Sequence, residues 1–290
     1  MSVDEPDEIH IDEYDEAEEL AYKEQQLKLK QSVLEKVKHP TNKMIVHPTN
    51  KNPMDSPFSS WFGHIGVLPR GEDWPKIQKI SPFPLCQINT AELPYTLPQL
   101  KGIAMICVWL VCAESRWERG SCNGNGWLLR CYSSLSDLVP TTYFYPRLKK
   151  KDSPSTFFSR LLDFTHWTDY VPPCSITWEL ADDYPYPPYV KNLLTDEEYS
   201  IYDSLYFCCD DPMSVENVDV SKVGGWPTVI EFEPFGQFKH SPFLDFILQI
   251  RSCPELSWGW FTPNDERSFG FFAHSRLSDD WLFDRHSWLR

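Results

Sequence analysis

The sequence predicts an α+β fold, with two pseudo-repeated antiparallel β units in one domain preceded by an N-terminal amphipathic helix. Three observations lead to this prediction. Twelve Trp residues favour strands with large core side chains. Twenty-five prolines against twelve glycines indicate many turns and few long helices. A pattern of turn and strand also occurs twice, and 290 residues suffice to bury a sizeable core.

The negative charge of the chain is concentrated at its N-terminus. Residues 1–20 hold ten carboxylates and no Lys or Arg, so the formal charge of −15 leaves only 27 − 32 = −5 for the remainder. We therefore expect residues 1–13 to be a disordered acidic tail and residues 14–290 to be a single domain. An acidic surface does not attract phosphates, which argues against a nucleic-acid partner. The tail either keeps the chain soluble or meets a basic partner.

Residues 14–38 have a helical pattern that Pro40 ends. Their apolar residues recur at seven- and three-residue steps: Leu20, Leu27, Leu34 and Val37. Four such positions do not sustain the seam of a coiled coil, so packing on the chain's own domain is favoured over a partner-binding coiled coil. A short repeat follows, with HPTNK at 39–43 and again at 47–51. We interpret it as a turn, a short strand and a turn.

The informative repeat is longer. The segment 60–75 aligns with 221–236, and PLCQIN at 84–89 aligns with FILQIR at 246–251. The spacing from the Ser to the Gln is 27 residues in the first copy and 28 in the second. We place the first repeat at about 58–112, an irregular insert at 113–220 and the second repeat at about 221–275.

These residues resemble the YwqG-like family, which is marked by a Ser-x-Phe-Gly-Gly turn, a Trp-Pro and a Leu-x-Gln-Ile-Asn strand, with a second copy near the C-terminus. The first copy has Ser60, Phe62, Gly63, Leu68, Pro69, Gly71, Trp74, Pro75, Gln87, Ile88 and Asn89. The second has Ser221, Val223, Gly224, Gly225, Pro227, Gln249, Ile250, Trp258 and Gly259. The resemblance spans roughly residues 14–275 and implies the β-rich fold. His64 and Gly66 depart from the pattern, where Gly and Pro are expected.

The glycines suit a turn that needs positive φ or a close backbone approach, and we expect His64 to adopt the left-handed conformation at some cost. Gln87 and Gln249 are polar residues in apolar strands, so each must be hydrogen-bonded if it is buried. The favoured interpretation is that each bonds the neighbouring turn. The alternative is a shared cleft, for which the candidate lining residues are Trp74, Gln87, Gln249 and Trp258.

The insert between the copies has four recognisable elements. Strands are expected at 126–132, 141–146 and 175–180. A helix is expected at 195–207, where Thr195 and Glu198 have the spacing of a capping box.

Nine cysteines, an odd number, include Cys107 within an apolar run. Such residues are typical of free thiols in a reducing compartment, so we expect a cytoplasmic protein. No Cys-x-x-Cys pair occurs, and we expect neither a metal nor another cofactor. No apolar run reaches the roughly 18 residues of a membrane span, so no membrane association is expected.

The sequence contains no Walker loop, G-x-S-x-G, G-x-G-x-x-G or H-E-x-x-H motif. We therefore favour a non-enzymatic protein-binding role, such as an adaptor or, as the resemblance implies for some members, an immunity protein for a toxin. The alternative is a small-ligand binder or hydrolase that uses a cleft between the two repeats. The oligomeric state and the identity of any partner stay open.

Overall fold

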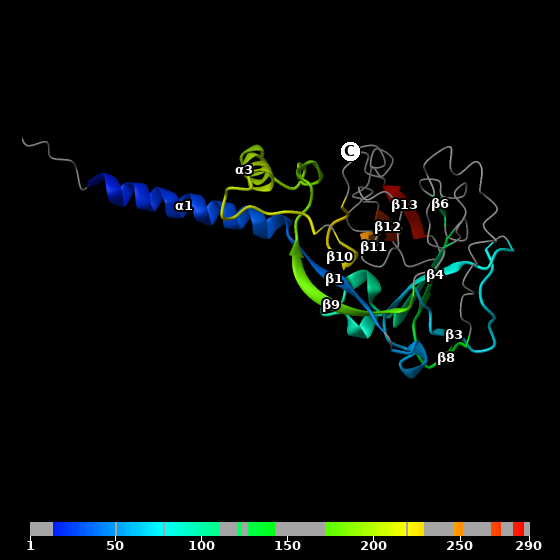
Figure 1. Cartoon of the computed structure of the whole chain (residues 1–290). Coiled ribbons are helices and arrows are strands. Elements are labelled where there is room, and N and C mark those ends of the chain that lie inside the picture. Colours follow the sequence, from blue (N-terminus) through cyan, green and yellow to red (C-terminus); the bar gives the residue numbers. More distant parts are fainter. Residues whose placement is uncertain are drawn as a thin grey trace, which may run out of the picture. The chain divides into compact units, whose positions relative to one another are not determined.

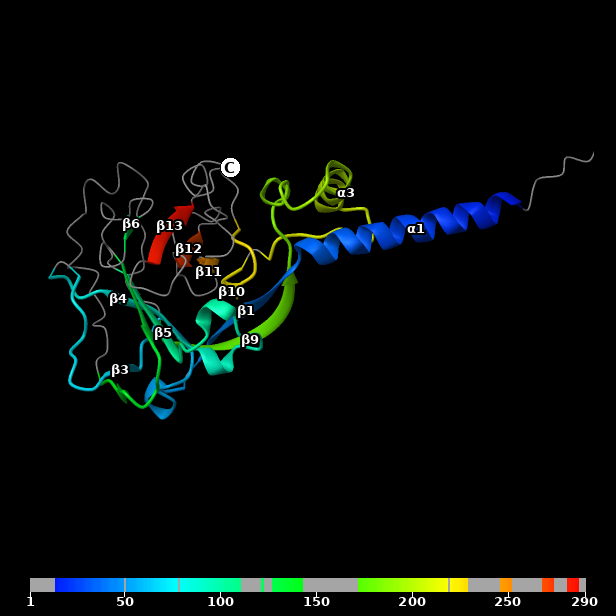
Figure 2. The same ribbon diagram turned by 180° about the vertical axis from the view of Figure 1, so that it is seen from behind.

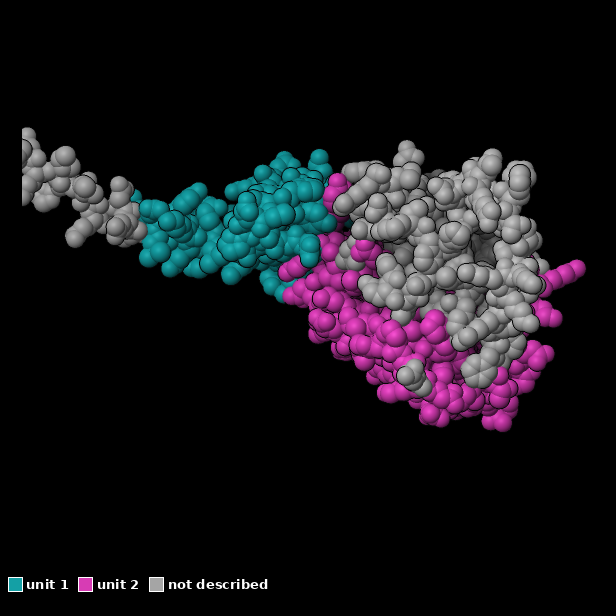
Figure 3. Space-filling view, viewed as in Figure 1, with its two compact units in different colours: residues 1–38, 187–216 teal, residues 39–186, 217–290 magenta. Residues whose placement is uncertain are grey.

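The computed structural model describes residues 14–49, 51–77, 79–110, 121–122, 127–142, 172–218, 220–228, 246–251, 268–273 and 281–286 (Figure 1). The chain divides into two compact units, of which unit 1 comprises residues 1–38 and 187–216 (Figure 3). Unit 2 comprises residues 39–186 and 217–290. The predicted acidic tail at 1–13 and Trp258 lie outside the described residues. No helix in the described part of the chain is long and apolar enough to cross a membrane.

Unit 1 is helical and contains α1 (Tyr14–Val37), the 3₁₀ turn η5 (Pro187–Tyr189) and α3 (Asp196–Phe207). The predicted capping box at the start of α3 is confirmed. The Glu198 N–H donates to Thr195 Oγ1 over 3.3 Å, and the Thr195 N–H donates to Glu198 Oε2 over 3.0 Å. These two bonds satisfy donors that a helix N-terminus otherwise leaves unpaired.

The two helices of unit 1 meet along the C-terminal half of α1. The last turns of α1 bury three side chains: Val33, Leu34 and Val37. Lys30 Nζ lies 2.6 Å from Asp211 Oδ2, just beyond α3, and Lys36 forms an ion pair with Glu198. Of the four apolar positions in the predicted stripe, Leu34 and Val37 are therefore buried, whereas Leu20 and Leu27 are exposed.

Unit 2 is built on one curled sheet in which every strand pair is antiparallel (Figure 2). In spatial order its eleven strands are β6 (Ser121–Cys122), β13 (Trp281–His286), β12 (Ser268–Ala273), β11 (Phe246–Arg251), β10 (Lys222–Gly224), β1 (His39–Pro48), β9 (Cys174–Asp183), β2 (Trp61–Phe62), β4 (Phe83–Asn89), β5 (Met105–Leu110) and β7 (Trp127–Tyr132). The strands β3 (Val67–Pro69) and β8 (Leu138–Pro140) form a separate ribbon. Short 3₁₀ turns are η1 (Pro53–Asp55), η2 (Thr90–Glu92) and η3 (Pro98–Leu100). The predicted α+β class with mostly β structure is confirmed.

Strand β1 differs from its prediction. The short strand expected between the HPTNK copies is present, but it extends over the whole first copy and the first two residues of the second, from His39 to Pro48. It pairs with β9 over its whole length, from His39 opposite Asp183 to Pro48 opposite Cys174. The partner strand provides the hydrogen bonds that local composition does not favour, so tertiary pairing overrides the turn propensity of Pro, Thr and Asn.

The two predicted strands that carry a glutamine, β4 and β11, pair in the same register with the short strands at their turns, β2 and β10. Trp61 of β2 lies opposite Gln87 of β4. Lys222 of β10 lies opposite Gln249 of β11. Each Gln strand then pairs on its other side with a further strand, β4 with β5 and β11 with β12.

The irregularities in these ladders also correspond. The register of β4 against β5 shifts between Pro84 and Cys86, and that of β11 against β12 shifts between Phe246 and Leu248. One residue therefore bulges at the same distance before each Gln. Such a bulge bends its strand locally.

The first strand before each hairpin pairs with the other hairpin. In sequence β1 precedes β2, yet it pairs with β10. Likewise β9 precedes β10 but pairs with β2. Because β1 and β9 also pair with each other, the sheet reads β9-β2-β4-β5-β7 on one side of its centre and β1-β10-β11-β12-β13-β6 on the other.

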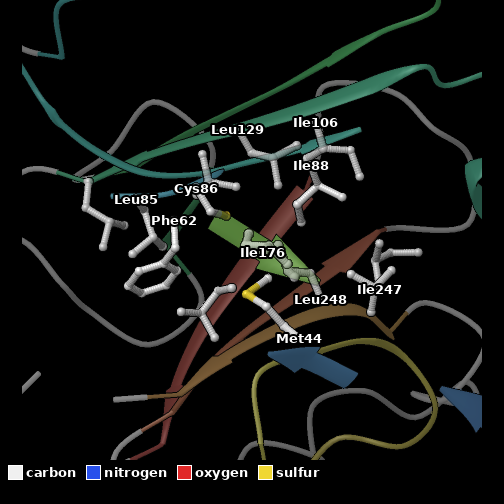
Figure 4. Close-up of a cluster of buried hydrophobic side chains, with 14 of the residues drawn as sticks. Met44, Phe62, Leu85, Cys86, Ile88, Ile106, Leu129, Ile176, Ile247 and Leu248 are labelled. Carbon is white, nitrogen blue, oxygen red and sulfur yellow. The ribbon is translucent and has the colours of Figure 1, made fainter. Parts of the chain in front are cut away.

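The main core of unit 2 takes side chains from both halves of the sheet (Figure 4). The labelled side chains come from β1, β2, β4, β5, β7, β9 and β11: Met44, Phe62, Leu85, Cys86, Ile88, Ile106, Leu129, Ile176, Ile247 and Leu248. A second cluster joins Met105, Cys107 and Trp109 of β5 to Val67 and Leu68 of the β3–β8 ribbon. Cys107 is a free, fully buried thiol, as predicted.

Candidate functional site

Gln87 is fully buried and fastens the first turn to strand β4. Its Oε1 accepts a hydrogen bond from the Gly66 N–H over 2.9 Å. Its Nε2 donates to the carbonyl oxygens of Pro57 and Ser59 over 2.8 and 2.7 Å. An amide group has two N–H donors, so both donors of Gln87 are used within the protein.

Gln249 is 2% exposed and repeats two of these three bonds in the second turn. Its Oε1 accepts from the Thr228 N–H over 2.9 Å. Its Nε2 donates to the carbonyl oxygen of Val220 over 3.1 Å and to Thr228 Oγ1 over 3.0 Å. The favoured prediction of bonding to the neighbouring turn thus describes both glutamines, and neither amide has a donor left over for a ligand.

A serine and a glycine complete each turn. Ser60 Oγ accepts from the Asn89 N–H over 3.0 Å, and Ser221 Oγ accepts from the Arg251 N–H over 2.9 Å. Gly63 and Gly224 have φ of 71° and 82°, in the left-handed region that side chains disfavour. The same three residue types therefore hold both turns.

The other predicted cleft residues have separate outcomes. Trp74 is 9% exposed, and its Nε1 donates to the Pro82 carbonyl oxygen over 3.0 Å. Its ring meets that of Trp109 edge-on at 6.0 Å, within the second hydrophobic cluster. Trp258 lies outside the described residues. Trp74 is therefore held as a core residue with its indole N–H satisfied.

The second turn contains a buried ion pair that sequence reasoning missed. Lys222 occupies the register position that Trp61 occupies in the first hairpin. Its Nζ lies 2.7 Å from Asp183 Oδ2 and 3.2 Å from Asn217 Oδ1, and the side chains of Lys222 and Asp183 are both 0% exposed. A buried charge requires such partners, because desolvation alone would be costly.

Backbone groups also hold the carboxylate of Asp183. Its Oδ1 accepts from the Val218 N–H and its Oδ2 from the Trp226 N–H, each over 2.7 Å. Burial raises the pKa of Asp183, although Lys222 and both N–H groups act in the opposite direction. A Cβ on Gly225 would lie 2.3 Å from Asp183 Oδ2, and φ there is 74°. Glycine at 225 is therefore required for the carboxylate to reach the turn.

No local signal in the sequence joins these residues. Asp183 ends β9 and Lys222 begins β10, 39 positions later. The nearest hint is Lys222, which the alignment of the two repeats places at the position of Trp61. That substitution could have suggested a buried lysine, but not its partner.

His64 stands where the family pattern has its second glycine. The expected left-handed conformation is wrong, because Lys79 is the only non-glycine residue with positive φ among the described residues. His64 is 4% exposed and lies edge-on to Trp61 at 6.3 Å. Desolvation lowers its pKa to about 4, so the imidazole is neutral at pH 7.

Burial of His64 should make stability fall as the pH drops from 6.5 towards 4. In this range the unfolded chain, with a His pKa near 6.5, binds the proton that the folded chain does not. A shift of this size corresponds to about 3 kcal/mol lost between the two pH values. Urea denaturation of wild type and His64→Asn at several pH values measures it. The free energy of unfolding of the wild type should fall by this amount relative to that of His64→Asn as the pH drops from 6.5 to 4. A difference between the two proteins that does not change with pH would contradict the lowered pKa of His64.

The chain matches no protein-family model and has no significant match among curated proteins. The resemblance to the YwqG-like family therefore rests on the residues quoted above and stays a prediction. Within the described part of the chain, no group of three or more His, Cys, Asp or Glu side chains could hold a metal ion.

Proposed function

We propose that the chain is a non-enzymatic protein-binding protein that docks its partner on the N-terminal half of α1. The observation that carries this proposal is the exposure of large apolar side chains on a helix segment with little packing of its own. Leu20 is 61% exposed, Tyr22 62% and Leu27 46%, and every residue from 18 to 25 is exposed. The buried side chains of α1 begin only at Val33.

A helix half without packing is marginal in water, because most helical stability in proteins comes from a buried face. Two local ion pairs support it, Lys23 with Glu19 and Lys28 with Glu24. Pairs of this kind contribute about 0.3–0.5 kcal/mol each. Leu20 and Leu27 lie two turns apart on one line with the buried Leu34, so a partner could continue the packed face of the helix.

The charge of this surface indicates a basic partner. Residues 14–25 contain five carboxylates and one lysine, a net charge of −4. A second copy of this surface would be repelled because it carries the same charge. A partner with Lys and Arg around an apolar stripe of its own would be attracted and oriented. A second copy of the chain does not supply these basic groups from the C-terminal part of its own α1, because Lys30 and Lys36 are already paired with carboxylates of unit 1. An adaptor or an immunity-like protein would use such a surface.

The alternative of a ligand-binding or hydrolytic cleft has less support. It relied on Gln87 and Gln249 as polar anchors, and the turns use the amide donors of both. Trp74 donates its indole N–H to a backbone carbonyl. A ligand would have to displace these bonds before any of the three could bind it.

The proposal predicts that Leu20→Asp/Leu27→Asp loses a specific partner. The tagged full chain, this double variant and Leu193→Asp are compared by quantitative affinity purification from the cells of origin. Leu193 is a matched control because it is 56% exposed and also belongs to unit 1. A protein recovered with wild type and Leu193→Asp, but reduced at least about tenfold with the double variant, is the expected result.

Circular dichroism serves as the folding control, and the double variant should retain the helix content of the wild type. A partner recovered equally by all three proteins would place the binding surface elsewhere. A recovered partner whose binding is unaffected by added salt would contradict the basic character inferred from the charge of α1.

We propose further that the two hairpins are copies of one unit and that the chain belongs with the YwqG-like proteins. The matching registers, bulges and Gln bonds support a duplication. The crossing of β1 and β9 indicates that each half completes the other half's sheet. An amphipathic helix before one duplicated domain remains the organisation that the sequence predicts.

A further inference from the structure

We propose that Lys222 and Asn217 form a covalent amide bond to each other, with Asp183 as the acid–base group. The observation is that a fully buried amine and carboxylate meet a half-buried carboxamide at one site. Lys222 Nζ lies 2.7 Å from Asp183 Oδ2 and 3.2 Å from Asn217 Oδ1. This bond would be a modification of the second turn, independent of the partner surface on α1.

The distance allows attack after a small movement. A C=O bond is about 1.2 Å long, so Asn217 Cγ lies within about 4.4 Å of Lys222 Nζ. Reactants held this close react as if at very high concentration. The amine needs to shift by roughly an ångström, from the plane of the carboxamide to its face, to reach near-attack geometry.

The site also holds the carboxamide in place and polarises it. Asn217 Nδ2 donates to the Tyr184 carbonyl oxygen over 3.0 Å. Asn217 Oδ1 accepts from Thr228 Oγ1 as well as from Lys222. When Lys222 moves to attack the carbon, Thr228 remains as the donor that favours the negative charge developing on this oxygen. The same Thr228 bonds Gln249, so the second turn itself positions the electrophile.

Asp183 supplies the proton transfers. In a buried site the neutral pair of amine and carboxylic acid competes with the ion pair, because desolvation disfavours both charges. Transfer of a proton from Lys222 to Asp183 gives the neutral amine, whose lone pair attacks Asn217 Cγ. The bond from Nζ to Cγ forms, and the bond from Cγ to Nδ2 breaks.

The reaction needs no further reactant. Asp183 protonates the departing nitrogen and takes the proton that the attacking nitrogen loses, so that ammonia leaves. The products are the amide, ammonia and the protonated acid, and nothing is oxidised or reduced. The reaction removes the buried ammonium and leaves Asp183 able to donate a hydrogen bond to the new amide.

The first hairpin cannot carry this bond, because Trp61 occupies the position of the lysine. The modification would therefore distinguish the two turns and fix one of them permanently. The amide would also remove the charge of a lysine that lies among apolar residues such as Val223 and Leu248.

The test is mass spectrometry of the full chain, unfolded and digested with trypsin. The amide predicts an intact mass lower than that of the sequence by one ammonia. It also predicts that cleavage after Lys222 fails, so the tryptic peptide 192–239 appears uncut and lighter by one ammonia. Cleavage before Asp219 should then leave its two parts joined.

A cyclic imide at Asn217 would also release ammonia, and the digest separates the two. The imide leaves Lys222 open to trypsin and persists in Lys222→Arg, whereas the proposed bond is absent in that variant. Asp183→Asn should also lack the bond. Unmodified mass in the wild-type chain, or an ammonia loss that persists in Lys222→Arg, would overturn the proposal, and the wild-type digest decides even if a variant fails to fold.

Discussion

Replacing Asp183 with alanine should destabilise the protein by about 3–5 kcal/mol, the usual cost of removing one partner from a buried ion pair. Because the proposed amide bond needs Asp183, the variant leaves Lys222, which is 0% exposed, as an ammonium without a counter-charge. It also removes the acceptor of the Val218 and Trp226 N–H groups. The free energy of unfolding from urea titration, monitored by tryptophan fluorescence, measures the effect.

The neighbouring Asp182→Ala is the matched control, because it deletes the same side chain from an exposed position on the same strand. We expect a change within about 0.5 kcal/mol. Equal effects of the two substitutions would show that the ion pair does not hold the second turn.

Replacing Gln87 or Gln249 with leucine should cost at least about 3 kcal/mol each. Leucine keeps a similar volume but leaves backbone groups of the turn without partners: the Gly66 N–H and two carbonyl oxygens in the first turn. Each unsatisfied buried group costs about 1–3 kcal/mol. Urea denaturation of both variants gives the values, and the two should be similar because two of the three bonds correspond.

Gln31→Ala, on the exposed surface of α1, controls for the loss of a glutamine amide and should change stability by less than about 0.5 kcal/mol. Near-wild-type stability of both leucine variants would mean that the turns hold without their glutamines. A large effect in one turn alone would contradict the equivalence of the two.

The parts of the fold that the sequence predicted are those with local signals. The capping box of α3 involves residues three apart, and the Gln strands alternate with recognisable turns. The favoured role of Gln87 followed from one physical requirement, that a buried amide must be bonded. These features need no knowledge of distant residues.

The parts that were missed depend on contacts far apart in the sequence. The residues 39–43 and 47–48, on either side of the predicted short strand, have the composition of turns but join that strand because β9 lies beside them. The exchange of β1 and β9 between the two halves has no local signature, and neither does the pairing of Asp183 with Lys222. His64 was placed by analogy with glycine, yet its environment is a packed one that needs no left-handed backbone.

Hydrogen exchange at two backbone amides tests the central claim, that each turn is fastened by a glutamine side chain. The Gly66 and Thr228 N–H groups lie in turns and donate to the Oε1 atoms of Gln87 and Gln249. Residue-resolved exchange should show both protons protected as strongly as the amides of β4, with the protection lost in the corresponding leucine variants. Exchange of both protons at the rate of an exposed turn in the wild-type protein would contradict the account.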